Sequence, residues 1–170
     1  MADGDPVTTG LRATVITVSD EIAHGDEDRG GTLAETLLTQ LGVEVTRAVV
    51  PDDPIQLVAA VTSAIADGSR FVMTCGGTGI GPHDRTSDVV GGLLTFQIPG
   101  IAEEIRRRGL AHTPQSLVSR EVAGAIVPAR GAPVLVLCAP GSRGGVRDAL
   151  EVVGPVLGYV IDQLDGAGHV

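Results

Sequence analysis

The chain has few cysteines, almost no aromatic side chains and no long apolar stretch. Cys75 and Cys138 are its only cysteines, which excludes a disulfide framework and a zinc site built from four cysteines. Two thiols are typical of buried cysteines in a reducing compartment, and inert packing is the role we expect for both. Because aromatic residues make up only 2% of the 170 residues, the core must consist of Val, Leu, Ile and Ala side chains.

The sequence also lacks the signals of membrane insertion and of export. No apolar stretch approaches the roughly 20 residues that a membrane-spanning helix needs. The first ten residues, MADGDPVTTG, contain neither the basic nor the apolar region of a signal peptide. We therefore expect a cytoplasmic protein with no membrane partner.

Basic residues are outnumbered by acidic ones. Twelve Lys and Arg residues against 21 Asp and Glu residues give a net charge of −9, and such a surface repels nucleic-acid phosphates. The sequence contains no cluster of basic residues with interleaved aromatics, so we expect no nucleic-acid partner. An anionic ligand would need main-chain N–H groups, a few arginines or a metal ion at its binding site.

Strand-like and helix-like segments alternate along the chain. A length of 170 residues fits one domain, which we place at residues 12–167 after a flexible tail at residues 1–11. The predicted strands cover 13–18, 43–50 and 70–74, with an antiparallel hairpin over 123–127 and 132–140; the predicted helices cover 32–41, 51–68, 87–94, 99–109 and 146–164. Pro155 should kink the last helix. Because most strands are apolar throughout, they predict a mostly parallel open sheet with helices on both faces, a three-layer α/β/α fold.

Capping residues define where two of these helices begin. In the helix over 51–68, Asp53 suits the N-cap and Pro54 the first helical position, which leaves Asp52 without a capping role. Thr86 or Ser87 is expected to cap the next helix. Six residues of the helix over 51–68 fall on one face: Ile55, Val58, Ala59, Thr62, Ile65 and Ala66.

Polar loops follow the predicted strands. In open parallel sheets, ligands bind at the carboxyl ends of the strands, and four polar segments emerge there: Ser19-Asp20, Pro51-Asp52, 75–84 and 140–145. In the third, CGGTGIGPHD, glycines permit a positive φ and close approach of the backbone to a ligand. Successive N–H groups before a helix form an anion-binding concavity.

A plain turn between strand and helix is the alternative interpretation of this glycine-rich segment. It matches neither the phosphate loop that ends in Gly-Lys-Ser/Thr nor the G-x-G-x-x-G spacing. The segment APGSRGG occupies the equivalent place after another apolar strand, and this coincidence favours a binding site.

Asp52 and Asp84 are the carboxylates that we expect to be catalytic. Nucleotidyl transfer uses a divalent cation, usually Mg²⁺, held by one or two carboxylates and by substrate phosphates. The alternative role for Asp84 is to stabilise a helix start, and Asp52 could simply face solvent. His83 is either a general base or an exposed loop histidine. Three arginines are either phosphate ligands or ordinary surface residues: Arg85, Arg143 and Arg147.

Seven segments, taken in order, resemble the MogA/MoaB family of molybdenum-cofactor biosynthesis proteins, which is related to the G domain of gephyrin. They are VSD (18–20), DRGG (28–31), VPDD (50–53), CGGTGIGPHDRTSD (75–88), IPGIAEEIR (98–106), SR (119–120) and APGS (139–142). The most specific element is the GGTG-x₄-D loop with its downstream Thr-x-Asp. The resemblance extends over nearly all of the chain after residue 11.

The resemblance implies a three-layer α/β domain that binds molybdopterin. In the enzyme branch of the family, a terminal phosphate of molybdopterin attacks the α-phosphate of Mg-ATP and gives adenylyl-molybdopterin and pyrophosphate. Asp52 and Asp84 then match the two acidic residues, as catalytic groups and as ligands of Mg²⁺. The residues that match the substrate-binding segments are Ser19, Asp20, Gly76, Gly77, Thr78, Gly79, Asp88, Pro140, Gly141, Ser142 and Arg143.

The second loop departs from the family pattern. It usually continues Pro-Gly-x-x-Lys-Ala, but Gly144 stands at the lysine position. Arg143 or Arg147 could supply the positive charge, although an arginine fork is not equivalent to a lysine ammonium. Three functions therefore stay open: a molybdopterin adenylyltransferase, a MoaB-like non-catalytic molybdopterin-binding or carrier protein, and an unrelated nucleotide-binding module. The resemblance also implies a homo-oligomer, trimer or hexamer, and a separate molybdate-inserting enzyme as a partner.

Overall fold

The computed structural model describes residues 8–167, so residues 1–7 of the predicted tail lie outside the described part. Residues 8–11 lie against the turn at residues 41–44. There the Gly10 N–H donates to Gly42 O at 3.3 Å, and the Glu44 N–H donates to Leu11 O at 2.8 Å. Within residues 8–167, no helix is both long and apolar enough to span a membrane.

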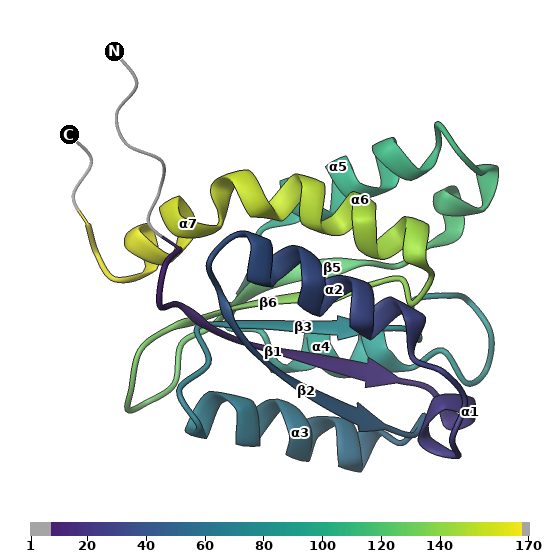
Figure 1. Ribbon diagram of the computed structural model, residues 1–170, viewed down its shortest axis with the longest axis horizontal. Coiled ribbons are helices and arrows are strands. Elements are labelled where there is room, and N and C mark those ends of the chain that lie inside the picture. Colours follow the sequence, from purple (N-terminus) through teal and green to yellow (C-terminus); the bar gives the residue numbers. More distant parts are fainter. Residues whose placement is uncertain (1–7, 168–170) are drawn as a thin grey trace.

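Six strands form one sheet in the order β2-β1-β3-β6-β5-β4 (Figure 1). Their bounds are β1 Arg12–Val18, β2 Glu44–Val50, β3 Phe71–Cys75, β4 Phe96–Gln97, β5 Val122–Ile126 and β6 Val134–Ala139. β2, β1, β3 and β6 are parallel, whereas β5 is antiparallel to both β6 and β4. The mostly parallel sheet with an antiparallel hairpin is confirmed; the short β4 was not predicted.

Helices cover both faces of this sheet (Figure 1). They are α1 Asp20–Ala23, α2 Arg29–Gln40, α3 Pro54–Ala66, α4 Thr86–Leu93, α5 Pro99–Gly109, α6 Arg143–Val153 and α7 Leu157–Leu164, with 3₁₀ turns η1 Pro114–Val118 and η2 Gly154–Val156. Core residues of α2, α5, α6 and α7 pack on one face, and those of α3 and α4 on the other. The kink expected at Pro155 is confirmed, because η2 separates α6 from α7.

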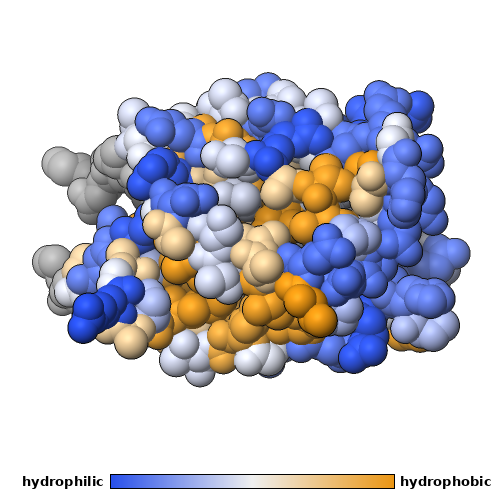
Figure 2. All heavy atoms as spheres, turned by 90° about the horizontal axis from the view of Figure 1, so that it is seen from below, coloured by the Kyte–Doolittle hydropathy of each residue, from blue (hydrophilic) through white to orange (hydrophobic). Residues whose placement is uncertain are grey.

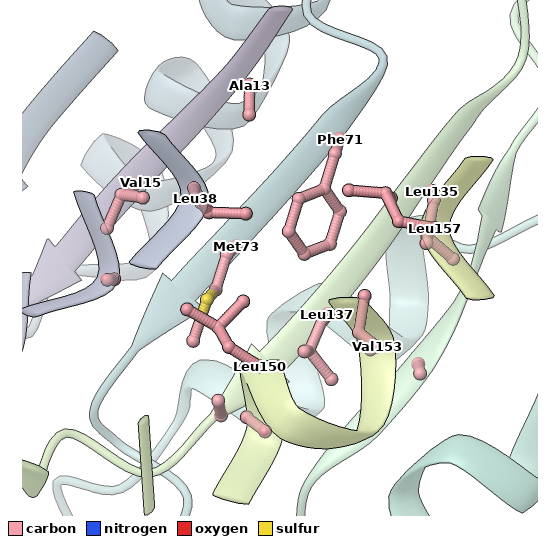
Figure 3. Packing of buried hydrophobic residues seen from close by; sticks show 14 of the residues in the cluster. Ala13, Val15, Leu38, Phe71, Met73, Leu135, Leu137, Leu150, Val153 and Leu157 are labelled. Carbon is pink, nitrogen blue, oxygen red and sulfur yellow. The ribbon is translucent and has the colours of Figure 1, made fainter. Parts of the chain in front are cut away.

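Two cores result from the alternation of side chains along the central strands; both are mostly aliphatic, as expected, but one also contains Phe71 and Met73. On one side, Met73 belongs to a buried cluster with Leu137 and Leu150 (Figure 3). The preceding residue of β3, Val72, belongs to the opposite cluster with Leu57 of α3. Burying one such side chain contributes about 1.5–3 kcal/mol, so packing on both faces stabilises the sheet.

The face that was predicted for α3 is not the buried one. Leu57, Val61 and Ala64 are buried, whereas Ile55 is 80% exposed and Val58 is 36% exposed. The helix is apolar around most of its circumference, so the spacing of its apolar residues does not distinguish the packed side from the exposed side. Its predicted start is correct.

The starts of α2 and α4 differ from the prediction for local reasons. α2 begins before residue 32 because Asp28 is its N-cap and accepts from the Gly31 N–H at 2.8 Å. Neither Thr86 nor Ser87 caps α4, since both lie buried within its first turn. The N-cap position belongs to Arg85, which makes no capping hydrogen bond.

Candidate functional site

The four predicted loops leave the same edge of the sheet. The chain passes from β1 to β2 on one side of β1 and then crosses to β3 on the other side, which makes the gap between β1 and β3 a topological switch point. The Ser19 N–H continues the pairing beyond β1 by donating to Val50 O at 3.0 Å. The Gly76 N–H does the same beyond β3 by donating to Ala139 O at 3.0 Å. The loops are therefore held beside one another.

Asp20 and Asp52 link the loops that follow β1 and β2. The Asp52 N–H donates to Asp20 Oδ1 at 2.9 Å, and the Asp20 N–H donates to Asp52 Oδ2 at 3.1 Å. Asp53 is occupied as the N-cap of α3, accepting from the N–H groups of Ile55 and Gln56. Asp52 is thus free of the capping role, as the sequence predicts, and it lies beside a second carboxylate.

The glycine-rich loop after β3 has the backbone conformation that its sequence suggests. Gly76 and Gly77 have φ values of 108° and 67°, which side chains rarely tolerate. A Cβ on Gly76 would lie 2.5 Å from Val18 O, and one on Gly77 would overlap Thr86 Oγ1. Within residues 8–167, the N–H groups of residues 77–79 make no hydrogen bond, so they are available to an anion.

Arg120 holds this loop through hydrogen bonds to its main-chain oxygens. The sequence did not reveal this role. Its guanidinium donates to Gly79 O at 2.8 Å, to Asp84 O at 2.6 Å and to Asp88 Oδ1 at 2.9 Å. Its own N–H donates to Thr78 O at 2.7 Å. The only signal was the segment SR at 119–120, and nothing in the sequence connects it to a loop some forty residues earlier. Asp88, predicted as a substrate ligand, forms an ion pair with Arg120 at 2.9 Å.

The Asp84 carboxylate is turned into the glycine loop. Its Oδ2 accepts from the Gly81 N–H at 2.9 Å, and a Cβ on Gly79 would lie 2.5 Å from the same oxygen. The hydrogen bond between the Gly81 N–H and Asp84 therefore stabilises the glycine loop. A small hollow of about 10 Å³ is lined by Asp52 together with His83, which precedes Asp84. The loops that carry the two predicted catalytic acids are thus adjacent, and His83 itself is exposed.

The donor set fits a magnesium ion only if the substrate supplies most of its ligands. Within residues 8–167, no group of three or more His, Cys, Asp or Glu side chains is placed to hold a metal. Asp52 and Asp84 each use one carboxylate oxygen for a main-chain N–H and keep the other. One or two carboxylates plus phosphate oxygens and water is the usual Mg²⁺ environment at nucleotide sites, and these residues match it.

The second loop packs directly on the first. A Cβ on Gly141 would lie 3.2 Å from Gly76 Cα. Ser142 caps α6 by accepting from the Gly145 N–H at 3.1 Å, and Arg143 is exposed beside it. Arg147 lies one turn further along α6 and lines a separate cavity of about 590 Å³ between α2 and α6. Arg143 is the cation that directly follows the N-cap of this loop.

Asp28 holds the start of α2 against β1 and β2, and this role was not predicted. It accepts from Thr17 Oγ1 at 2.7 Å, from the Gly31 N–H at 2.8 Å and from Arg47 Nη2 at 2.6 Å. Burial raises the pKa of this carboxyl, but the hydrogen bonds and the Arg47 charge outweigh burial, so the pKa lies below its usual value. Asp28 is therefore a fixed negative charge that joins α2 to β1 and β2.

Both cysteines are buried near the ends of β3 and β6. Burial raises the pKa of Cys75 far above its usual range and that of Cys138 to about 11. Both thiols are therefore protonated at neutral pH and are poor nucleophiles.

An open, mostly parallel sheet with a glycine loop and two acidic loops at the carboxyl ends of its strands defines an α/β domain of the class that binds ligands at this edge. Comparison with known families is more specific. Residues 14–159 match the family model described as "Probable molybdopterin binding domain". The chain belongs to this family of molybdenum-cofactor biosynthesis proteins, which includes MogA and MoaB.

Curated relatives and solved structures agree with this assignment. The chain is 38% identical over 162 residues to a "Molybdenum cofactor biosynthesis bifunctional protein" of Synechococcus elongatus, covering 94% of this chain and 49% of that protein. It thus spans about half the length of this bifunctional relative. It is 34% identical over 140 residues to a "Molybdopterin adenylyltransferase" of Pyrococcus furiosus, covering 82% of each.

The fold is shared with crystal structures of the same family. A molybdopterin biosynthesis protein from Mycobacterium abscessus superposes with a TM-score of 0.83 at 37% identity, covering 92% of this chain and 97% of that one. The tungsten cofactor synthesizing protein MoaB from Pyrococcus furiosus superposes with a TM-score of 0.85 at 31% identity, covering 91% and 97%.

Proposed function

We propose that this protein is a molybdopterin adenylyltransferase that activates molybdopterin with Mg-ATP. The observation that carries the proposal is the reciprocal pairing of Asp20 with Asp52, at the same sheet edge as a glycine loop whose N–H groups at residues 77–79 make no hydrogen bond within residues 8–167. Carboxylates and main-chain donors in one place suit two phosphorylated substrates that share a metal ion. The similarity to a protein named molybdopterin adenylyltransferase supports the same reaction.

The proposed step is a phosphoryl-centred displacement. A terminal phosphate oxygen of molybdopterin forms a bond to the α-phosphorus of ATP, and the bond from that phosphorus to the bridging oxygen of the β-phosphate breaks. Pyrophosphate leaves with the electron pair, and adenylyl-molybdopterin remains. Mg²⁺, when bound, neutralises charge on the phosphates.

The chain's own residues position the two anions in this proposal. Asp52 and Asp84 present their free carboxylate oxygens to the metal, and the N–H groups of residues 77–79 bind phosphate oxygens. Asp20 keeps the loop of Asp52 in place, and Arg143 supplies a cation. Catalysis then comes from orientation and from charge stabilisation, not from a covalent enzyme intermediate.

A non-catalytic molybdopterin-binding or carrier protein is the second candidate, because of one specific observation. Gly144 stands where the family usually has lysine, and every one of the 12 basic residues of this chain is an arginine. No lysine elsewhere in the chain can therefore replace the missing ammonium group. If that group is needed for turnover, the protein binds the pterin without adenylylating it.

Pyrophosphate release separates the two candidates. Purified protein is mixed with molybdopterin and Mg-ATP, and pyrophosphate is measured with and without EDTA, for wild type, Asp52→Ala and Asp162→Asn. Asp162 is an exposed acid of α7 and serves as the matched control. We expect metal-dependent release from wild type and Asp162→Asn but not from Asp52→Ala. Pterin binding without any release would support the carrier function instead. ATP binding without pterin affinity would favour an unrelated nucleotide-binding module.

Self-association, as a trimer or hexamer, and a molybdate-inserting partner remain proposals. Figure 2 shows apolar side chains gathered on the side of the molecule that carries α3. Ile55 and Val58 of α3 are exposed there, and a second copy of the chain packed on this side would bury them. Light scattering on wild type and Ile55→Asp tests this: a monomeric wild type contradicts it, and a smaller mass for Ile55→Asp supports it.

A further inference from the structure

A cavity of about 590 Å³ lies between α2 and α6, which pack on the same face of the sheet (Figure 1). It shares no lining residue with the loops that carry the proposed phosphate and metal ligands. Its volume falls within the roughly 300–1,000 Å³ that is typical of small-molecule sites. The proposed function therefore assigns no role to a cavity that is large enough for a ligand.

The two helices that form its walls approach each other near both of their ends. Near their starts, a Cβ on Gly30 of α2 would lie 3.7 Å from Val146 Cγ2 of α6. Near their ends, a Cβ on Gly154 would lie 3.1 Å from Leu41 Cδ1. These close approaches fix the spacing of α2 and α6, so the cavity is present without a ligand, as is usual for small-molecule sites.

The wall of this cavity is mainly aliphatic. Leu37 and Leu41 line it on the side of α2, and Leu150 and Pro155 line it on the other side. Leu41 is 38% exposed, so a ligand with an apolar part would remove its side chain from water, which favours binding. None of the residues that line the cavity is aromatic, so a flat ring would find no stacking partner there. An alkyl chain fits this wall better than an aromatic ring does.

Two charged side chains of α6 line the cavity, Arg147 and Glu151. Glu151 is already paired, because its Oε2 accepts from Arg108 Nη1 of α5 at 2.9 Å. Within residues 8–167, the guanidinium of Arg147 makes no hydrogen bond and no ion pair. The cavity therefore presents one uncompensated positive charge, in a chain whose net charge is −9.

We propose that this cavity binds a free aliphatic carboxylate, with the carboxylate on Arg147 and the alkyl chain along the leucines of the wall. The N–H donors of a guanidinium form a planar fork that matches the two oxygens of a carboxylate. Arg147 and Gly154 lie about 10 Å apart along the helix at 1.5 Å per residue, the length of an alkyl chain of roughly eight to ten carbons. A single cation suits a ligand with a single negative charge. Binding here does not depend on the proposed function.

Three probes separate the contributions of charge and chain length: decanoate, butyrate and decyltrimethylammonium. Isothermal titration calorimetry gives their affinities for the wild-type protein, and we expect decanoate to bind at one site per chain. Butyrate should bind at least tenfold more weakly, because six methylene groups no longer leave water. Decyltrimethylammonium should also bind at least tenfold more weakly, because Arg147 repels its charge. Equal affinities for decanoate and decyltrimethylammonium would contradict a carboxylate site.

Two variants and a control test which residues bind decanoate. Arg147→Gln should weaken binding at least fivefold by removing the guanidinium, and Leu41→Glu should do the same by placing a negative charge in the apolar wall. Both positions are exposed, so Tm should stay within about 2 °C of wild type. Arg130→Gln, at an exposed arginine that does not line the cavity, should bind as wild type does. In NMR spectra, decanoate should shift the amide signals of residues 37–41 and 147–154. Unchanged affinity in Arg147→Gln, or shifts confined to the exposed apolar side chains of α3, would overturn the proposal.

Three other occupants of the cavity give different results. A second copy of the chain would make the amide signals of residues 37–41 change on dilution without decanoate, and we expect no such change. Removing residues 1–7 should leave the decanoate affinity within about twofold of wild type; a rise of tenfold or more would mean that these residues fill the cavity. Arg147-dependent sedimentation with phosphatidylglycerol vesicles, without binding of free decanoate, would assign the surface to membranes and overturn the proposal.

Discussion

Asp20 and Asp52 exchange hydrogen bonds between two loops, each carboxylate accepting the main-chain N–H of the other residue at 3.1 Å or less. The exchange fixes both acids beside each other at the carboxyl ends of β1 and β2. Each acid keeps one oxygen that makes no hydrogen bond to the main chain of the other loop. The pairing therefore holds the loop of Asp52 in place, which the proposed role of Asp52 as a metal ligand requires.

Removing the charge of Asp52 should affect turnover and not folding. Asp52→Asn keeps an oxygen that can accept the Asp20 N–H but loses the negative charge that binds the metal. We expect pyrophosphate release to fall at least tenfold, about 1.4 kcal/mol of transition-state stabilisation, with Tm within about 2 °C of wild type. Equal losses of stability and activity would show that Asp52 only holds the loop.

Arg120 should control the shape of the glycine loop. Arg120→Ala removes three hydrogen bonds to residues 79, 84 and 88, and we expect unfolding free energy to fall by about 1–3 kcal/mol. Hydrogen exchange at residues 77–85 should accelerate more than exchange in β3, and ATP affinity should fall. Arg130→Ala, at an exposed arginine, is the control; uniform acceleration in both regions would contradict a local role.

Asp28 should make stability depend on pH in the acidic range. Its pKa in the folded protein lies below the ordinary 3.8, so its contribution is complete above that value and is lost as pH falls through the lowered pKa. Urea unfolding at pH 7 should show Asp28→Asn destabilised by about 1.5–3 kcal/mol. The difference in unfolding free energy between wild type and Asp28→Asn should narrow near pH 2, as the carboxyl of wild type becomes protonated. A difference that stays constant with pH would mean that the Asp28 charge does not stabilise the fold.

The two cysteines should be inert in the folded state. With the pKa of Cys138 raised to about 11 and that of Cys75 raised further, iodoacetamide at about pH 8 should label neither thiol. Unfolding in urea should make both react. Rapid labelling of the native protein, followed by mass spectrometry, would contradict their burial.

Much of the fold could be predicted because local signals agree with the tertiary structure. The apolar strands, the glycines and prolines between segments and the Asp53-Pro54 helix start all lead to the observed sheet. The packed face of α3 could not be predicted, because Ile55 and Leu57 are equally apolar and only the neighbouring sheet distinguishes them. Two short elements, α1 and β4, are too brief to produce a periodic pattern.

The placement of the candidate site residues was predictable where they directly follow a strand. Ser19, Asp20 and Asp52 lie at strand ends, and parallel strands bring those ends together. Arg120 lies in a later segment, and its contacts with the glycine loop depend on how the segment after η1 packs. No spacing in the sequence encodes those contacts, so only the structure could reveal them.

Transfer of the adenylyl group is tested most directly by following the α-phosphate of ATP. Wild-type protein is incubated with molybdopterin, Mg²⁺ and ATP labelled at the α-phosphorus, and the pterin product is analysed by mass and by label. We predict one labelled AMP unit on each pterin, formed with one pyrophosphate and absent when EDTA is added. Pterin that remains bound and unlabelled after prolonged incubation with Mg-ATP would contradict an adenylyltransferase.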